Sequence, residues 1–213
     1  LSTLGWTDAA GTPSFCLEGS LFNAGTVIQW LRDGLQIIDQ APQVNELARS
    51  VPDSGGVMLV PAFTGWGTPH WDPQARGVLV GLTRDSGRGH IARAALEGIA
   101  LSVATLVELA EQALGSGLGE LAVDGGAAAS DPLLQAQADC TGLTVRRPAS
   151  LESTARGVAL FAGLQAGVIS DLEQLATARR DGAELFHPQM DASQRNRWRT
   201  RWQDAVTRSL GWH

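Results

Sequence analysis

The chain has 213 residues, of which 44% are hydrophobic, and it carries a formal net charge of -6 at pH 7. This length supports one large domain or two small ones with a buried core, and the negative charge argues against sequence-independent nucleic-acid binding, which needs a basic surface. All 16 basic residues are arginine, which excludes chemistries that need a lysine: Walker A loops, protein kinases and Schiff-base enzymes.

The first elements predicted are a β-hairpin and a helix. Two short extended runs flank residues 8–11 and predict a hairpin with a longer loop. LFNAGTVIQWLRDGL predicts a helix that stops at Gly34, with helical spacing carried by Phe22, Thr26, Gln29 and Trp30. The chain opens on a predicted strand without an initiator Met, so we expect it to be a piece of a longer protein.

The middle of the chain predicts two strands and one long helix. GGVMLVPAF and GVLVGLT are typical of strands, and the Gly-, Pro- and Trp-rich segment between them indicates a long structured loop. A weak helical signal at residues 45–49 precedes them. Apolar residues at helical spacing over residues 90–114 predict a widely buried helix, with Ile99 in its stripe and an i, i+4 pair between Arg93 and Glu97.

The following segments alternate between strands and helices. ELAVDGG is a predicted strand, Asp131 and Pro132 start a helix that runs to about Cys140, LTVRRP is a strand, and STARGVALFAGLQAGV is a helix. This alternation indicates an α/β fold. The last of these helices has small residues that permit close packing on a sheet or another helix: Ala155, Ala159, Ala162, Gly163 and Ala166.

A terminal helix is predicted at the end of the chain. One helical stripe is expected to cover the core, and it contains Trp198, Trp202, Ala205 and Ser209. The same segment holds the densest basic cluster, which we interpret as a solvated helix face and not as a nucleic-acid patch. This cluster contains Arg195, Arg197, Arg199 and Arg201.

The segment VDGGAAASDP, residues 123–132, connects a predicted strand to a predicted helix. Ligands of open α/β sheets bind at such connections. Gly125 and Gly126 permit close backbone approach, and Ser130 or Asp131 can cap the helix ahead of Pro132. From these residues alone, a tight turn that requires glycine explains Gly125 and Gly126 at least as well as a ligand-binding loop does.

Other candidate side chains show no spacing that indicates a site. Cys16 and Cys140 lie far apart, which predicts neither a disulfide nor a zinc site and fits a reducing cytoplasm. Asp72 and Asp124 are interpreted as groups that order loops. No apolar run approaches the roughly 18 residues of a membrane span, and the N-terminus lacks signal-peptide features. The scattered histidines are interpreted as packing or surface residues: His70, His90, His187 and His213.

Four motifs, in this order and at this spacing, resemble the C-terminal domain of the FGGY carbohydrate kinases. They are VPAFTGWGTPHWDPQARGVLVGLTR, HIARAALEGIA, VDGGAAASDPLLQAQADCTG and STARGVALFAGLQAG. The resemblance covers almost the whole chain and is strongest to members that phosphorylate glycerol. It implies the actin/Hsp70/hexokinase-like (ribonuclease H-like) fold, with a mixed sheet flanked by helices. Residues 1–213 would be the C-terminal nucleotide-binding domain of a two-domain kinase whose N-terminal domain lies outside this chain.

The resemblance also implies where a nucleotide binds. In that family the glycine loop approaches the nucleotide through its backbone, and the matching positions here are Gly125, Gly126 and Ala127. Ser130 stands where members that phosphorylate glycerol commonly have an Asn near adenine, and a hydroxyl cannot make the paired contacts of an amide. Further contacts are implied from Asp85 to Gly89. Members that phosphorylate glycerol often have Gly at the position of Asp85. A carboxylate near the phosphates of a nucleotide is unfavourable, so the residue at this position departs from the family pattern.

The activity implied by the resemblance is transfer of the ATP γ-phosphoryl group to a glycerol hydroxyl, with Mg²⁺ accompanying the nucleotide. The family's catalytic base and polyol contacts lie upstream of the position that Leu1 matches, so we expect no catalytic residue in this chain. A homo-oligomer is compatible with this interpretation, and no nucleic-acid or membrane partner is expected. The alternatives are a kinase for xylulose or gluconate and a non-catalytic actin-like binding module.

Overall fold

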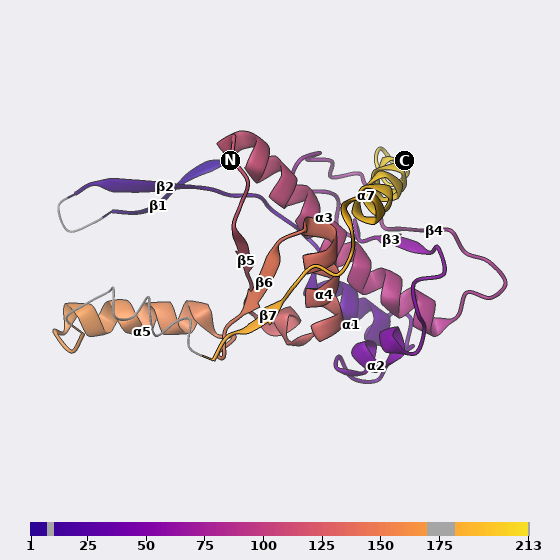
Figure 1. The fold of residues 1–213 in the computed structure, drawn as a ribbon, viewed down its shortest axis with the longest axis horizontal. Coiled ribbons are helices and arrows are strands. Elements are labelled where there is room, and N and C mark those ends of the chain that lie inside the picture. The colour runs from indigo at the N-terminus through magenta and orange to yellow at the C-terminus, as the bar shows by residue number, and fades with distance from the viewer. Residues whose placement is uncertain (8–10, 170–181, 213) are drawn as a thin grey trace.

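The longest helix, α3 (Arg88–Leu114), runs through the middle of the molecule (Figure 1). The computed structural model describes residues 1–7, 11–169 and 182–212. α3 contacts α1, α2, α4 and β3. By length and composition α3 could cross a membrane, but 67% of its apolar window is buried inside the protein. α3 is therefore the core helix that the apolar spacing predicted.

The close approach of α3 to β3 (Met58–Val60) depends on Gly98. A Cβ atom at Gly98 would overlap the carbonyl oxygen of Leu59. β3 pairs in antiparallel fashion with β4 (Val78–Val80), in the register that places Leu59 opposite Leu79. Both predicted strands of this region are confirmed, and the segment between them forms the predicted long loop.

Two short helices pack beside α3. α2 (Gln43–Arg49) confirms the weak signal in that segment. α1 (Gly25–Asp33) confirms the predicted helix, and of the residues whose spacing predicted it, Trp30 packs against the core. Phe22 precedes the helix and is 47% exposed, and Thr26 and Gln29 are also exposed. The buried side chains lie on the neighbouring face of the helix: Val27, Ile28 and Leu31.

A mixed three-stranded sheet carries the second half of the fold. β5 (Glu120–Ala122) pairs in parallel with β6 (Thr144–Arg147), and β7 (Glu184–Phe186) pairs with β6 in antiparallel fashion. α4 (Asp131–Thr141) forms the crossover between the two parallel strands. α4 packs on α3 and also on β6, so it joins the sheet to the main core.

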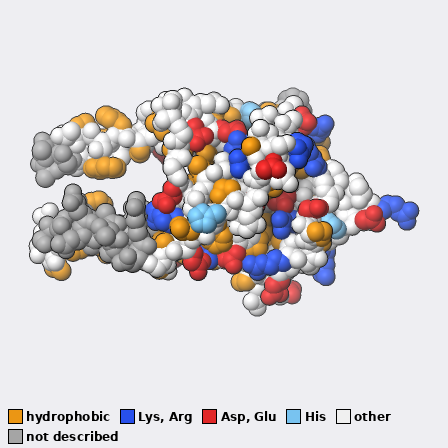
Figure 2. Space-filling model, in the orientation of Figure 1, with side chains coloured by type: hydrophobic (Ala, Val, Ile, Leu, Met, Phe, Trp, Pro, Cys, Tyr) orange, Lys and Arg blue, Asp and Glu red, His pale blue; other side chains and the backbone are white. Residues whose placement is uncertain are grey.

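Two elements extend from one end of the molecule (Figure 1): the hairpin of β1 (Ser2–Thr7) and β2 (Pro13–Leu17), and helix α5 (Ser153–Gln165). The hairpin is confirmed by antiparallel pairing, although residues 8–10 of its loop lie outside the described ranges. Hydrophobic side chains follow the hairpin on the visible face (Figure 2). Trp6 is 62% exposed and Phe15 is 71% exposed.

The close packing that we expected of α5 is not observed. No residue of α5 is buried among the parts of the chain that the structure describes. Its small residues lie along a helix that projects from the same end of the molecule as the hairpin (Figure 1). Val158 and Phe161 are each 67% exposed.

The terminal helix α7 (Ala192–Thr207) covers the core as predicted. Trp202 and Ala205 are buried, as is Ser209 just beyond the helix, and the Trp202 indole donates a hydrogen bond of 3.1 Å to Thr105 Oγ1. Trp198 is half-buried against the same core.

The prediction that the arginines of α7 form a solvated face is wrong for two of them. Arg195 Nε donates to the Asp139 carbonyl at 2.9 Å, and Arg199 Nε donates to the Cys140 carbonyl at 2.8 Å. Carbonyl groups in the last turn of a helix lack intrahelical donors, so these side chains satisfy the C-terminal end of α4. Arg199 also reaches Glu108 on α3 at 2.5 Å. Arg197 and Arg201 are exposed.

The burial of α3 predicts the effect of shortening Ile99, which is 2% exposed. We expect Ile99→Ala to lower the free energy of unfolding by about 2–5 kcal/mol, because transfer free energy is lost and a cavity is left. Denaturant unfolding of the purified chain measures the change. The matched control is Leu114→Ala at the exposed end of the same helix, for which we expect less than about 0.5 kcal/mol. Equal effects of the two substitutions would contradict the burial of Ile99.

One carboxyl group in α3 is buried. Glu97 is 7% exposed, and its Oε1 atom lies 2.8 Å from Arg93 Nε. Burial raises the pKa of Glu97, and the ion pair with Arg93 opposes that shift without cancelling it. The folded protein therefore holds the Glu97 proton more tightly than the unfolded chain does.

The raised pKa of Glu97 predicts a pH dependence of stability. As pH rises from the unfolded-state pKa, about 4.3, through the higher folded pKa, the free energy of unfolding contributed by this group falls and then levels off. We expect Glu97→Gln to remove this fall. Urea unfolding of both proteins between about pH 4 and pH 7 measures it. A variant with the same pH profile as the parent would contradict the assignment.

Candidate nucleotide-binding site

The glycine loop leaves β5 and enters α4, as its sequence predicted. Val123 N donates to the Arg146 carbonyl at 3.1 Å and extends the pairing of β5 with β6. Gly125 then turns the chain, and the 3-10 helix η1 (Gly126–Ala129) leads to Ser130 at the N-cap of α4. The Ser130 hydroxyl accepts a hydrogen bond of 3.3 Å from Leu133 N, which confirms one of the two predicted caps.

Gly125 and Gly126 differ in whether the backbone conformation itself requires glycine. Gly125 has a φ of 78°, a conformation that side chains rarely adopt. Gly126 does not have a positive φ, and a Cβ atom built there meets no described atom within 4 Å. A tight turn therefore accounts for Gly125 but not for Gly126. Gly126 is exposed, and none of the described residues outside its immediate neighbourhood in the chain covers its backbone.

Both ends of η1 are held by the segment that begins with β6. Gly125 N donates to the Leu151 carbonyl at 2.9 Å. The Arg147 guanidinium donates to the Ala128 carbonyl at 3.0 Å, and the Ala128 side chain is buried. Ala127 packs against the main hydrophobic core. The loop is thus fixed on its inner side and open on its outer side.

Ser130 is committed to contacts within the chain. It is 5% exposed, and its hydroxyl donates a hydrogen bond of 2.5 Å to Asn45 Oδ1 on α2. With its oxygen accepting from Leu133 N, the hydroxyl proton is not available to a nucleotide. Sequence reasoning missed Asn45, because the two residues are 85 positions apart and no spacing connects them.

Asp85 and Gly89, the other two predicted contact residues, belong to the segment before and at the start of α3. Asp85 is exposed in the turn before α3, and its N–H group donates to Thr83 Oγ1 at 3.3 Å. Gly89 is buried against the C-terminal end of α2, where a Cβ atom would lie 2.7 Å from Ser50 Oγ. The structure brings Gly125, Gly126, Ala127 and Ser130 together and gives Gly89 a packing role. A nucleotide contact at Asp85 or Gly89 stays a prediction.

The remaining carboxylates of interest lie in loops. Asp72 orders its loop as predicted, because Oδ1 accepts from Gln74 N at 2.8 Å and Oδ2 accepts from Gly211 N at 2.7 Å. Asp124 is exposed beside the glycines, and its role stays a prediction. Within the described ranges, no group of three His, Cys, Asp or Glu side chains is arranged to hold a metal ion.

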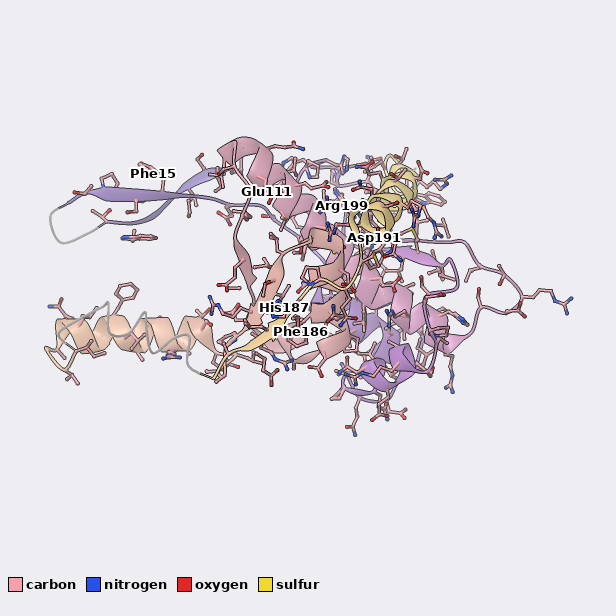
Figure 3. The ribbon with its side chains drawn as sticks, viewed as in Figure 1. Phe15, Glu111, Phe186, His187, Asp191 and Arg199 are labelled. Carbon is pink, nitrogen blue, oxygen red and sulfur yellow. The ribbon has the colours of Figure 1, made fainter. Side chains whose placement is uncertain are left out.

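The thiol and the imidazoles have local structural roles. Burial raises the pKa of the Cys140 thiol to about 12, so it stays protonated at neutral pH. His90 Nδ1 accepts from Gly87 N at the start of α3, and His187 Nδ1 lies 3.2 Å from Thr144 Oγ1 (Figure 3). Burial lowers the pKa of His70. His213 lies outside the described residues.

Comparison with known proteins gives the family. Residues 2–166 match the C-terminal domain of the FGGY family of carbohydrate kinases. The chain belongs to this family. It is 51% identical, over 212 residues, to a glycerol kinase of Aromatoleum aromaticum, and the match covers all of this chain but 42% of that relative. The chain therefore spans less than half the length of the full-length FGGY kinases that it matches.

Solved structures of FGGY kinases confirm the fold. The chain superposes on the crystal structure of Plasmodium falciparum glycerol kinase with ADP, with a TM-score of 0.90 and 30% sequence identity over 99% of this chain and 42% of that chain. A xylulose kinase from Lactobacillus acidophilus matches with a TM-score of 0.71 and 21% identity over 98% of this chain and 43% of that chain, which supports the fold alone. The predicted actin/Hsp70/hexokinase-like fold class is confirmed.

Proposed function

We propose that this chain is the nucleotide-binding part of an ATP-dependent glycerol kinase, which transfers the γ-phosphoryl group of ATP to a glycerol hydroxyl. The observation that carries the proposal is the exposed backbone at Gly126, where a Cβ atom would meet no described atom within 4 Å. The structurally similar glycerol kinase of Plasmodium falciparum was crystallised with ADP. The high identity to a named glycerol kinase supports glycerol as the acceptor.

The chemistry divides between this chain and the rest of the enzyme. Residues 125–127 would receive the nucleotide against their backbone, with Mg²⁺ accompanying its phosphates. The fixed inner side of η1 keeps that surface in place. The acceptor hydroxyl would lose its proton to a base outside these 213 residues, and domain closure would exclude water. The chain's own task is therefore to bind and orient ATP.

An apolar groove supports the proposal that a further domain packs on this chain. The groove has a volume of about 330 Å³ and lies between the base of the hairpin, α3 and β5. Leu17, Leu106 and Leu121 are among its lining residues. Together with the exposed hydrophobic side chains of the hairpin (Figure 2), it forms a surface of the kind that soluble proteins usually cover. We propose that the part of the full-length protein missing from this chain covers it.

The division of labour predicts that the isolated chain does not phosphorylate glycerol. A catalytic base alone is typically worth about 10²- to 10⁴-fold in rate, and the loss of substrate positioning reduces the rate further. The measurement is glycerol 3-phosphate formation from ATP by the purified chain, with the full-length protein as the positive control. Turnover by the isolated chain at the rate of the full-length protein would refute the proposed division.

The same assay distinguishes the alternative functions. A full-length protein that phosphorylates xylulose or gluconate in preference to glycerol would replace the proposed acceptor. A full-length protein that binds ADP and phosphorylates none of the three would support the non-catalytic actin-like module.

The open face of the loop predicts that a side chain at position 126 blocks the nucleotide. Since no described atom would contact the new Cβ, we expect Gly126→Val to weaken ADP binding by the full-length protein by about tenfold or more while the thermal midpoint changes little. Calorimetry and thermal melts measure the two effects.

The matched control for this substitution is Gly119→Val. Gly119 is exposed just before β5, it does not have a positive φ, and a Cβ atom there also meets no described atom within 4 Å. The control is expected to keep the parent's ADP affinity. If Gly126→Val also keeps it, the loop is a structural turn and the nucleotide lies elsewhere.

A further inference from the structure

Arg147, the last residue of β6, joins the glycine loop to the sheet. Its Nη1 atom donates to the Ala128 carbonyl of η1 at 3.0 Å and to Asp131 Oδ1 at 2.9 Å. Its Nη2 atom pairs with Glu184 on β7. Its guanidinium carbon lies 5.1 Å from the centre of the Phe186 ring, which Figure 3 labels on β7. One side chain thus contacts η1, α4 and β7.

These contacts need a guanidinium group. The Arg147 side chain is only 15% exposed, and a planar fork of five N–H donors can serve a carbonyl and two carboxylates at once. A lysine ammonium is a single point charge on a flexible stem and cannot reproduce this arrangement. Burial works against the charge of Arg147, but its hydrogen bonds to Glu184 and Asp131 outweigh that effect and raise its pKa. The group stays charged.

The Ala128 carbonyl is the structurally important acceptor. It belongs to the same 3-10 turn as Gly126, and Arg147 reaches it from the side of the sheet. The other end of the turn is tied to the same part of the chain, because Gly125 N donates to the carbonyl of Leu151. Asp131 is held in turn by Arg49 of α2 at 3.2 Å. The turn therefore has fixed points before and after Gly126.

We propose that Arg147 is a positioning residue of the nucleotide site. It touches neither nucleotide nor acceptor but fixes η1, so that the backbone at Gly126 already has its binding geometry before ATP arrives. This inference rests on the proposed function, because it assigns Arg147 to the same site. Pre-organisation of a binding loop increases affinity by reducing the ordering that binding requires. Loss of Arg147 is therefore expected to weaken ATP binding more than it slows phosphoryl transfer.

The neighbouring residue provides a matched control. Arg146 lies on the same strand, and successive side chains of a strand point to opposite faces. Its side chain is 13% exposed, close to the value for Arg147, and its Nε atom pairs with Glu120 of β5 at 2.7 Å. That ion pair joins two strands of the sheet and does not involve η1. Arg146→Met thus removes a similarly buried arginine and ion pair without touching the loop.

The experiment compares Arg147→Met, Arg147→Lys and Arg146→Met in the full-length protein. For Arg147→Met we expect the KM for ATP and the Kd for ADP to rise about tenfold, with kcat and the KM for glycerol within about twofold of the parent. Arg147→Lys is expected to restore only part of the affinity. Arg146→Met is expected to lower the thermal midpoint by an amount similar to that of Arg147→Met while both nucleotide constants stay at the parent's values.

A lower thermal midpoint with an unchanged KM for ATP in Arg147→Met would show a purely structural residue and overturn the inference. If Arg147→Met does not fold, Asp131→Asn is used, because it keeps the shape of the side chain and removes the charge that faces Arg147. For Asp131→Asn we expect a rise in the KM for ATP that is smaller than the tenfold rise expected for Arg147→Met. An unchanged KM for ATP would overturn the inference.

The test also separates this inference from the function on which it rests. If the parent binds no ADP and phosphorylates no acceptor, the proposed function and the positioning role both fail. If Gly126→Val loses ADP affinity while the Arg147 variants keep it, only the positioning role fails.

Discussion

The contact between α3 and its neighbours is the constraint on which the rest of the structure depends. Gly98 lets the helix backbone approach β3, and the opposite side of α3 receives α4, where Cys140 Sγ lies 3.3 Å from the Ala100 carbonyl. α4 is therefore placed by a core that closely packed backbones and small side chains define. Because the glycine loop runs directly into α4, its position follows from that packing and not from the loop sequence alone.

Side chains from distant parts of the chain contribute to the hydrogen bonding at both ends of α4. Ser130 caps its first turn and is itself held by Asn45, whereas Arg195 and Arg199 bind the carbonyls of its last turn. The terminal helix thus contributes to the candidate site without touching it. It fixes the far end of the helix whose near end follows the glycine loop.

Local signals predicted most elements correctly. Apolar periodicity gave α3, Gly and Pro marked the loop between β3 and β4, and the Ser130 cap was visible beside Pro132. Tertiary partners could not be predicted in the same way. The buried face of α1 depends on how that helix meets α3, and the Arg199 contacts join residues more than 50 positions apart. For the site, the open face of Gly126 was suggested by its sequence, but the role of Asn45 in holding Ser130 was not.

The β1–β2 hairpin shows what such a chain would do in isolation. A strand at the edge of a sheet presents unpaired backbone N–H and C=O groups, which are a template for pairing with another chain. In the hairpin these groups lie next to exposed side chains of Leu4, Trp6 and Phe15. A concentrated preparation of the chain would therefore be expected to aggregate through the hairpin, whereas the same residues would become interior once another domain covered them.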